Sequence, residues 1–403
     1  MHILLIHQAF ASLDDPGGTR HHELALILAG QGHQVSIIAS PVSYLTGKDI
    51  RSTGIEEDAG GMVKIYRVYT CTALHKSFIH RVISFLSFMI SSFFKCISIK
   101  NVDLVWGTTP PIFQAVTAWL VSRTKRVPFL LEVRDLWPEF AVAVGVLKDP
   151  TLIKLSYWLE KFLYSRADRI VVNSPGFTSH VSQKGGKNIS LIPNGADISL
   201  FDDKNSSNIR ENLGWADKFI VLYAGAHGMS NDLGVVLQTA KLLENQNKIH
   251  FILLGDGKEK SNLISEAEHL NLQNVTFLDP VPKNKVSEIL SAADACIAIL
   301  KPIEMYKTTY PNKVFDYMAA RKPVILAIDG VIRDVVEKAG CGLFCKPGDP
   351  KTLADGCLNL YNNQDKAISM GNNGYEYLKI HFDREKIAMD LLGLMKEMVN
   401  SHG

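Results

Sequence analysis

Apolar stretches of strand length alternate with helical stretches along the whole chain. Residues 2–6 (HILLI) and 34–39 (QVSIIA) flank a helical pattern over 20–30, which Gly32 ends. Continuous apolar strands separated by helices of this length are typical of βαβ units, in which helices cover both faces of a parallel sheet. The same pattern predicts further strands near 102–105, 128–133, 168–172 and 188–192. We therefore expect an α/β protein.

The alternation starts again after residues 202–217, a polar and turn-rich stretch typical of a linker. Further strands are predicted at 219–224, 249–254, 274–278, 295–300 and 323–328. These elements predict two Rossmann-like domains, at 1–203 and 215–383, with a helix over 384–403 packing back on the first domain. Ligands of such sheets bind beyond the carboxyl ends of the strands, so a cleft between the domains is the expected site.

Charge and cysteine content exclude several classes of protein. The net charge is only +2, with Lys and Arg scattered, which argues against nucleic-acid binding. The six cysteines form no C-x2-C pair and have no histidine at zinc-finger spacing, so buried thiols in a reducing compartment are favoured. The first residues lack the features of a signal peptide, and we expect a cytoplasmic protein.

Residues 78–99 (FIHRVISFLSFMISSFFKCISI) are too apolar for an ordinary surface helix, with one narrow stripe of serines and a lysine at helical spacing. The uninterrupted stretch 82–94 is shorter than the about 20 residues that cross a bilayer. A helix lying in the membrane interface, with basic residues near anionic headgroups, is favoured over a helix buried in the first domain's core, which stays open. The expected membrane contacts are Phe85, Phe88, Met89, Phe93 and Lys95.

Two segments of the first domain carry candidate site residues. Gly17 and Gly18 lie between the first strand and the first helix, where the backbone admits an anionic ligand, although a plain turn is an equally good interpretation. The stretch 131–139 (LEVRDLWPE) places charged groups at the end of a predicted buried strand. Such groups are costly unless they are paired or functional.

In the second domain, glycine turns at 225–228 (GAHG) and 255–257 (GDG) follow two predicted strands and would suit a diphosphate, although simple turns are commoner. The strongest local pattern is 310–324 (YPNKVFDYMAARKPV), in which Lys313 and Asp316 share one face of a helix start. A lysine for phosphate and a carboxylate for ribose hydroxyls would bind a nucleotide there. An ion pair between these two residues is the alternative.

Together these stretches resemble glycosyltransferase family four, especially its bacterial WbuB-like branch, which builds O-antigen and capsule repeats. The resemblance runs nearly end to end. Its specific motifs are 134–139 (RDLWPE) and 311–319 (PNKVFDYMA), supported by 17–20 (GGTR), 192–197 (IPNGAD) and 254–257 (LGDG).

The resemblance implies a GT-B fold, with two Rossmann-like domains facing across a cleft, and a metal-free transfer from a nucleotide sugar that retains the anomeric configuration. The implied catalytic residues are Gly18, Arg134, Asp135 and Glu139, and the implied acceptor-binding residues are His7, Arg20 and Trp137. The implied donor-binding residues are Gly17, His227, Gly228, Gly255, Gly257, Lys260, Val281, Lys285, Thr308, Thr309, Pro311, Asn312, Lys313 and Asp316.

The chain departs from the family pattern at three positions. Thr308 stands where the first acid of the family's Glu-x7-Glu motif falls, and Ala226 and Asp232 stand where the family has Arg and Lys. We therefore expect Lys313, Lys260 and the backbone at Gly228 to hold the diphosphate.

The function implied is transfer of a deoxy-amino or N-acetylamino sugar, such as N-acetyl-L-fucosamine, from a UDP donor to a polyprenyl-diphosphate-linked saccharide. This reaction would take place at the inner face of the cytoplasmic membrane, in O-antigen, lipopolysaccharide or capsule biosynthesis. Two alternatives stay open. One is a nucleotide-sugar epimerase of the same fold, and the other is a non-catalytic partner subunit that binds nucleotide sugar or lipid.

Overall fold

The computed structural model describes residues 1–43, 53–72, 78–201 and 206–402. These residues form two compact units. Unit 1 comprises Met1–Ala11, Gly18–Pro193 and Glu385–Gly403, and unit 2 comprises Ser12–Gly17 and Asn194–Arg384. The predicted linker over 202–217 lies partly outside the described residues, and its described part includes α7 (Ser206–Asn212) within unit 2.

Unit 1 contains an eight-stranded sheet in the order β3-β4-β2-β1-β5-β6-β7-β8, in which every neighbouring pair is parallel except β3 and β4. Its strands are β1 (His2–Ile6), β2 (Gln34–Ala39), β3 (Gly54–Asp58), β4 (Val63–Arg67), β5 (Leu104–Thr109), β6 (Phe129–Val133), β7 (Arg169–Val172) and β8 (Ile189–Leu191). The apolar runs predicted as strands are confirmed. Strands β3 and β4 were not predicted, because their exposed positions carry too many polar residues to form such a run.

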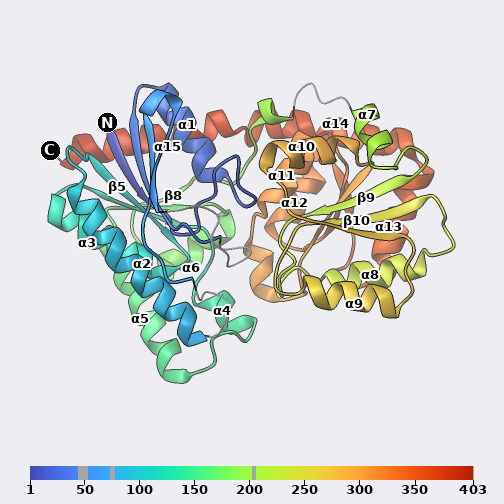
Figure 1. Ribbon diagram of the computed structural model, residues 1–403, viewed down its shortest axis with the longest axis horizontal. Helices are drawn as coiled ribbons and strands as arrows, with labels where there is room; N and C mark the ends of the chain where they lie inside the picture. The colour runs from blue at the N-terminus through green and yellow to red at the C-terminus, as the bar shows by residue number, and fades with distance from the viewer. Residues whose placement is uncertain (44–52, 73–77, 202–205, 403) are drawn as a thin grey trace. The chain divides into compact units, whose positions relative to one another are not determined.

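Helices cover both faces of this sheet (Figure 1). One face packs against α1 (Arg20–Gly30) and α15 (Arg384–His402), whose apolar residues form one core with β1, β2, β4 and β5. The other face is covered by α2 (Phe78–Ser98) and α3 (Ile112–Lys125), and α5 (Pro150–Arg166) packs beside α3. The shorter helices of unit 1 are α4 (Glu139–Ala143), α6 (Thr178–Gln183), η1 (Ala59–Gly61) and η2 (Pro175–Phe177).

Helix α2 buries Ser84 and Ser92 within unit 1 and turns much of its apolar surface outward. Ser84, Phe88, Ser92 and Cys96, spaced four residues apart, are fully buried. Serine is small enough for α2 to lie close to α3, and the Ser92 hydroxyl donates to the Met89 carbonyl three residues earlier in the helix at 3.1 Å. The prediction that Phe88 contacts a membrane is therefore wrong.

The outward residues of α2 are Ile83, Leu86, Ile90, Phe94 and Ile97, which are 37–69% exposed. A helix buried in the core would not expose such a row, and only 22% of the apolar window His80–Ser98 is buried. By length and composition alone, this helix is long and apolar enough to cross a membrane. The uninterrupted stretch 82–94 had been expected to be too short. A single helix of this kind is weak evidence for a membrane span.

Unit 2 contains a six-stranded parallel sheet in the order β11-β10-β9-β12-β13-β14. Its strands are β9 (Phe219–Ala224), β10 (Ile249–Leu254), β11 (Val275–Leu278), β12 (Ala295–Ile299), β13 (Val324–Ala327) and β14 (Gly342–Phe344). Its remaining helices are α8 (Leu233–Leu242), α9 (Lys260–His269), α10 (Lys283–Ala292), α11 (Asn312–Ala319), α12 (Val331–Ala339), α13 (Pro350–Asn362), α14 (Gln364–His381), η3 (Ile198–Leu200) and η4 (Glu304–Thr308).

Both faces of the unit 2 sheet are buried, as continuous apolar strands require. In β9, Ile220 and Leu222 join one core with α11 and α12, whereas Val221 and Tyr223 join a second core with α8 and α13. Figure 1 shows α8 and α9 on one side of this sheet and α10 and α11 on the other. The predicted fold, an α/β protein with two parallel sheets, is confirmed.

The orientation of α2 can be tested by comparing two phenylalanines on opposite faces. We expect Phe88→Ala to lower the free energy of unfolding by about 3–5 kcal/mol, because it leaves a cavity in a packed core. Phe94→Ala is the control, since this side chain is 69% exposed, and should change stability by less than about 0.5 kcal/mol. Urea denaturation measures both, and equal losses would show that the assigned orientation is wrong.

Candidate functional site

Two glycine loops of unit 2 touch each other at the carboxyl ends of β9 and β10. The amide of His227 donates to the carbonyl of Asp256 at 2.8 Å. A Cβ atom at Gly255 would lie 1.9 Å from the Gly225 carbonyl oxygen, and one at Gly257 would lie 2.6 Å from the His227 carbonyl oxygen. Glycine is therefore required at both positions by the packing of one loop on the other, with φ at +145° and +155°.

Lys313, at the start of α11, reaches into this pair of loops. Its ammonium lies 3.8 Å from the centroid of the Tyr223 ring and 3.5 Å from Oδ1 of Asn231. A Cβ atom on Gly225 would lie 2.9 Å from the ammonium, so this glycine leaves room for the charge. Burial lowers the pKa of Lys313 to about 7, and an anion bound beside it would raise that pKa again.

His227 lies beside this lysine and is fully buried. Neither of its ring nitrogens has a hydrogen-bond partner among the described residues. Burial, followed by the charges of Lys260 and Lys313, lowers the pKa of His227 to about 4, so the ring is neutral at pH 7. A neutral imidazole with unused nitrogens can donate one hydrogen bond and accept another.

Other predicted donor-site residues are engaged elsewhere in unit 2. The Lys260 ammonium lies 2.7 Å from the Asp279 carboxylate and 3.0 Å from the Gly255 carbonyl. Asp316 forms an ion pair of 2.6 Å with Lys283 of α10, so the alternative pairing of Asp316 with Lys313 is wrong. Lys260 is thus less free than Lys313 to meet a phosphate.

The remaining predicted donor-site residues have local structural contacts. Thr308 and Thr309 donate their hydroxyls to the carbonyls of Met305 and Tyr306 in η4. Asn312 accepts from Arg384 at 3.3 Å. Pro311 directly precedes α11, and Val281 packs against the unit 2 core. The Lys285 ammonium pairs with the Glu288 carboxylate, and the Gly228 carbonyl accepts a hydrogen bond from the Asn231 amide. Gly17 belongs to unit 2 and has φ at +149°.

In unit 1, a buried carboxylate joins three elements. Glu132 of β6 is 1% exposed and its two oxygens lie 3.1 Å from Nε of Arg20 and 2.7 Å from Nε2 of His21, both in α1. The Trp106 indole of β5 donates to it at 3.0 Å. Burial by itself raises the pKa of Glu132, but the nearby charges of His21 and Arg20 hold it well below its usual range. The remaining Arg20 donors bond the carbonyls of Ile192 and Pro193.

Arg20 therefore links β6 to the residues that follow β8. Because its guanidinium donors are used in these bonds, few remain for the acceptor that Arg20 was predicted to bind. His7 follows β1 and is 1% exposed, with its ring centroid 4.3 Å from that of His21. Burial, followed by the charges of Arg134 and His21, lowers the pKa of His7 well below 6.5. The sequence analysis did not identify His21. The signal that could have found it is Glu132, because a glutamate inside the apolar run of β6 needs a buried partner.

The residues of the motif 134–139 differ in exposure and in their hydrogen-bond partners. Asp135 is exposed at the carboxyl end of β6, and the Arg134 side chain donates to the Pro110 carbonyl. Trp137 is partly buried in the same turn. At Gly18 a Cβ atom would meet no atom within 4 Å, so the space above the start of α1 is open. These residues surround the carboxyl edge of the unit 1 sheet, where ligands of such sheets bind.

Glu139, expected to be catalytic, lies in a charged cluster with Glu160 of α5 and His180 of α6. His180 Nε2 is 2.8 Å from Glu160 and 3.6 Å from Glu139, and the Lys184 ammonium is 3.5 Å from Glu139. The ligand atoms of the two glutamates and the histidine lie within 4.8 Å of one another, so they could hold a metal ion. Lys184 already balances part of their charge. Burial and Glu160 raise the pKa of Glu139.

Both units match known glycosyltransferase domains. Residues 17–195 match the family model described as a glycosyl transferase 4-like domain, and residues 205–377 match the model described as glycosyl transferases group 1. The chain thus belongs to the GT-B glycosyltransferases of the family-four type.

Particular relatives share part of the sequence. "Probable glycosyltransferase WbjE" of Pseudomonas aeruginosa is 27% identical over 62% of this chain and 64% of its own length. WcaI of Escherichia coli K12, named as a glycosyl transferase of colanic acid biosynthesis, is 24% identical over 74% of this chain and 76% of its own length. The match thus spans somewhat under two thirds of WbjE.

Solved structures share the whole fold. Sucrose-phosphate synthase from Thermosynechococcus elongatus superposes with a TM-score of 0.81 at 19% identity, covering 99% of both chains. HepE from Anabaena, in complex with UDP and glucose, has a TM-score of 0.73 at 18% identity, covering 98% of this chain and 100% of its own. WaaG, a glycosyltransferase of lipopolysaccharide biosynthesis, has a TM-score of 0.71 at 14% identity, covering 98% and 99%. At these identities the likeness establishes the fold.

The role of Glu132 can be tested against a neighbouring acid. We expect Glu132→Gln to lower the free energy of unfolding by about 3–5 kcal/mol, because it leaves the buried Arg20 without its counter-ion. Asp135→Asn is the control, since Asp135 is exposed, and should leave stability within about 0.5 kcal/mol. Chemical denaturation near pH 7 decides. A loss for Asp135→Asn as large as that for Glu132→Gln would contradict this assignment.

Proposed function

We propose that this protein transfers a sugar, with retention, from a nucleoside-diphosphate donor to a lipid-linked saccharide during the synthesis of a surface polysaccharide. The observation that carries the proposal is the position of Lys313 in unit 2, between the Tyr223 ring and the glycine loop that follows β9. A cation held at the carboxyl edge of a parallel sheet suits a diphosphate.

The local chemistry supports a diphosphate rather than a neutral ligand. Lys313 lies in the first turn of α11, where free backbone amides add positive potential. Its ammonium has a ring and an amide oxygen as its described contacts, whereas Lys260 already meets a carboxylate. Lys313 therefore replaces the cations that the family carries at the positions of Ala226 and Asp232.

The proposed reaction needs no protein nucleophile. The bond from the sugar anomeric carbon to the leaving phosphate oxygen breaks while the acceptor hydroxyl oxygen bonds that carbon from the same face. The hydroxyl proton passes to the leaving phosphate oxygen. Lys313 and helix amides stabilise the charge that develops on the diphosphate, and positioning supplies much of the remaining rate.

We assign UDP to the donor and an amino sugar, such as N-acetyl-L-fucosamine, to the transferred group. HepE was solved with UDP and glucose and with UDP-glucose, which supports UDP. WcaI and WaaG are named for colanic acid and lipopolysaccharide biosynthesis, which supports a surface polysaccharide of the O-antigen or capsule kind. The acceptor is assigned to the carboxyl edge of unit 1, near Arg134, Asp135 and Trp137.

A polyprenyl-diphosphate acceptor requires contact with a membrane, and α2 provides a suitable surface. Besides the outward row from Ile83 to Ile97, unit 1 exposes Leu155 and Trp158 of α5, which are 56% and 60% exposed, and both helices pack against α3. Exposed apolar surface of this kind marks an interaction site. We propose that this face rests on the inner surface of the cytoplasmic membrane, with α2 lying in the interface.

The donor assignment is tested by thermal stabilisation with UDP, GDP, dTDP, CMP and NAD. We expect UDP to raise the melting temperature, since a ligand at a hundred times its dissociation constant adds about 2.7 kcal/mol. Lys313→Met should weaken UDP binding at least about tenfold through the lost charge-assisted contact, while the control Lys366→Met, at an exposed position of α14, should not. Stabilisation by NAD alone, or by none of the five, would contradict the proposal. Turnover with a lipid-linked acceptor distinguishes an enzyme from a binding subunit.

The membrane assignment is tested by vesicle flotation of the double variant Ile90→Ser/Phe94→Ser. We expect it to lose most of its binding to phosphatidylcholine vesicles, because each large side chain contributes about 1.5–3 kcal/mol when it leaves water. Leu242→Ser, on the exposed surface of unit 2, is the matched control. UDP stabilisation should be unchanged in both variants. Unaltered flotation of the double variant would refute the assigned face.

A further inference from the structure

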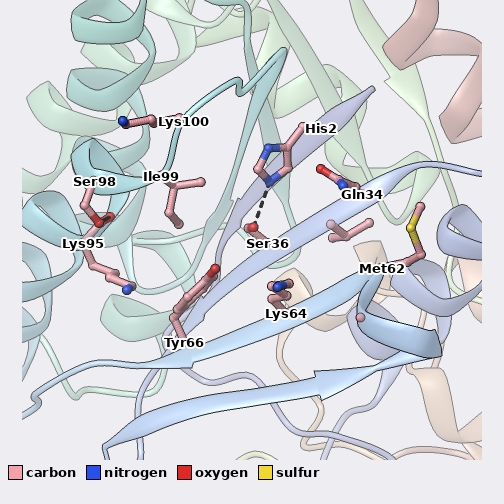
Figure 2. Close-up of a pocket in the computed structure, with 12 residues that line it drawn as sticks. His2, Gln34, Ser36, Met62, Lys64, Tyr66, Lys95, Ser98, Ile99 and Lys100 are labelled. Atoms are coloured by element: carbon pink, nitrogen blue, oxygen red, sulfur yellow. Dashed lines mark hydrogen bonds between the residues drawn. The ribbon is translucent and has the colours of Figure 1, made fainter.

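A pocket of about 350 Å³ opens in unit 1 between the sheet and the end of α2 (Figure 2). It lies at the amino ends of β1, β2 and β4, which is the edge opposite to the one that carries Arg134 and Asp135. It is therefore distinct from the proposed acceptor site. Its walls include His2, Ser36, Lys64 and Tyr66 from the strands, and Lys95 and Lys100 from α2 and the residues after it.

The lining is positively charged. Among the described residues that line the pocket, three are lysines and none is acidic. Lys95 extends toward the strands, with its ammonium 4.3 Å from the centroid of the Tyr66 ring, whereas Lys100 lies at the rim with its ammonium turned outward (Figure 2). Lys64 pairs with Glu57 at 2.9 Å, but both side chains are about half exposed, so a stronger anion can displace this pair at little cost.

Two features of the pocket wall are compatible with a bound anion. Both ring nitrogens of His2 are bonded within the wall. Nε2 lies 2.8 Å from the Ser36 hydroxyl (Figure 2), and Nδ1 lies 3.2 Å from the Asn101 carbonyl. The carbonyl end of α2 would repel an anion. The Lys125 ammonium neutralises it, at 2.5 Å from the Ile99 carbonyl oxygen and 3.2 Å from that of Ile97.

The pocket adjoins the apolar row of α2. Phe94 is 69% exposed and Ile97 is 37% exposed, and Lys95 lies between them in the sequence, on the flank of the same helix. A ligand with a phosphate in the pocket and an apolar tail beside it would contact Lys95 and Phe94 at once. A free phosphate would use the lysines and leave the apolar row uncovered.

We propose that this pocket binds the phosphate headgroup of an anionic membrane lipid. The proposal rests on the membrane association proposed for α2, and it makes unit 1 selective for anionic bilayers. The ligand chemistry is a phosphate monoanion held by Lys64 and Lys95, with the acyl chains outside the pocket.

The experiment is flotation of the full chain with vesicles of phosphatidylcholine alone and of phosphatidylcholine mixed with phosphatidylglycerol. General attraction gives about fivefold in affinity per lysine near an anionic surface. A matched control, Lys154→Gln/Lys161→Gln on exposed positions of α5, removes the same charge outside the pocket. We expect Lys64→Gln/Lys95→Gln to lose about tenfold more affinity for anionic vesicles than this control. Lys95→Arg, which keeps the charge, should retain most of it.

Both double variants should bind neutral vesicles like the unaltered chain and keep its UDP stabilisation, which shows that they fold. Equal losses for the two doubles would overturn the pocket assignment and leave only diffuse attraction. Tight calorimetric binding of inorganic phosphate, without any preference for anionic vesicles, would overturn the lipid assignment in favour of a soluble phosphate. If the unaltered chain floats with neither vesicle, the membrane association itself fails and this inference fails with it. UDP stabilisation tests the donor proposal separately.

Discussion

The parallel sheets impose the constraint on which the rest of this protein depends. A parallel strand buried on both faces has no place for charge along its length, so polar chemistry is confined to the strand ends. Unit 2 follows this rule, with Lys313 and His227 at the carboxyl edge of its sheet. Glu132 departs from this rule in unit 1, and it is tolerated in β6 because Arg20, His21 and Trp106 neutralise and hydrogen-bond it.

Helix α2 combines an apolar composition with a largely exposed position. A helix this apolar would ordinarily be buried, yet its inward face consists of serines, one phenylalanine and one cysteine. Small side chains on that face allow close packing on α3, and the larger apolar side chains are left outside. The outward row, the apolar residues of α5 and the lysine-lined pocket lie on the same unit, and together they support one proposed interface with an anionic membrane.

Much of the fold could be predicted from the sequence, because the hydrophobic period reports burial directly. The long apolar strands of both sheets lie where expected, whereas β3 and β4 were missed because exposed polar residues interrupt the apolar run in both. The site was predictable only in part. The GDG motif was visible, but its reason, the contact between the Gly255 loop and the Gly225 carbonyl, depends on residues about thirty positions apart in the chain. The ion pair of Asp316 with Lys283 was hidden for the same reason.

The sequence by itself determined the class of fold and the family, since both follow from local periodicity and contiguous motifs such as RDLWPE. The tertiary structure decided which side chains remain available to a ligand. Lys313 and Lys260 were both expected from the sequence to hold the diphosphate. Lys260 contacts the Asp279 carboxylate, whereas Lys313 contacts the amide oxygen of Asn231. Phe88 and Phe94 are neighbours in one apolar run, yet the packing of α2 against α3 buries the first and exposes the second. Whether a side chain can bind a ligand depends on contacts between segments far apart in the chain, and the local sequence carries little information about those contacts.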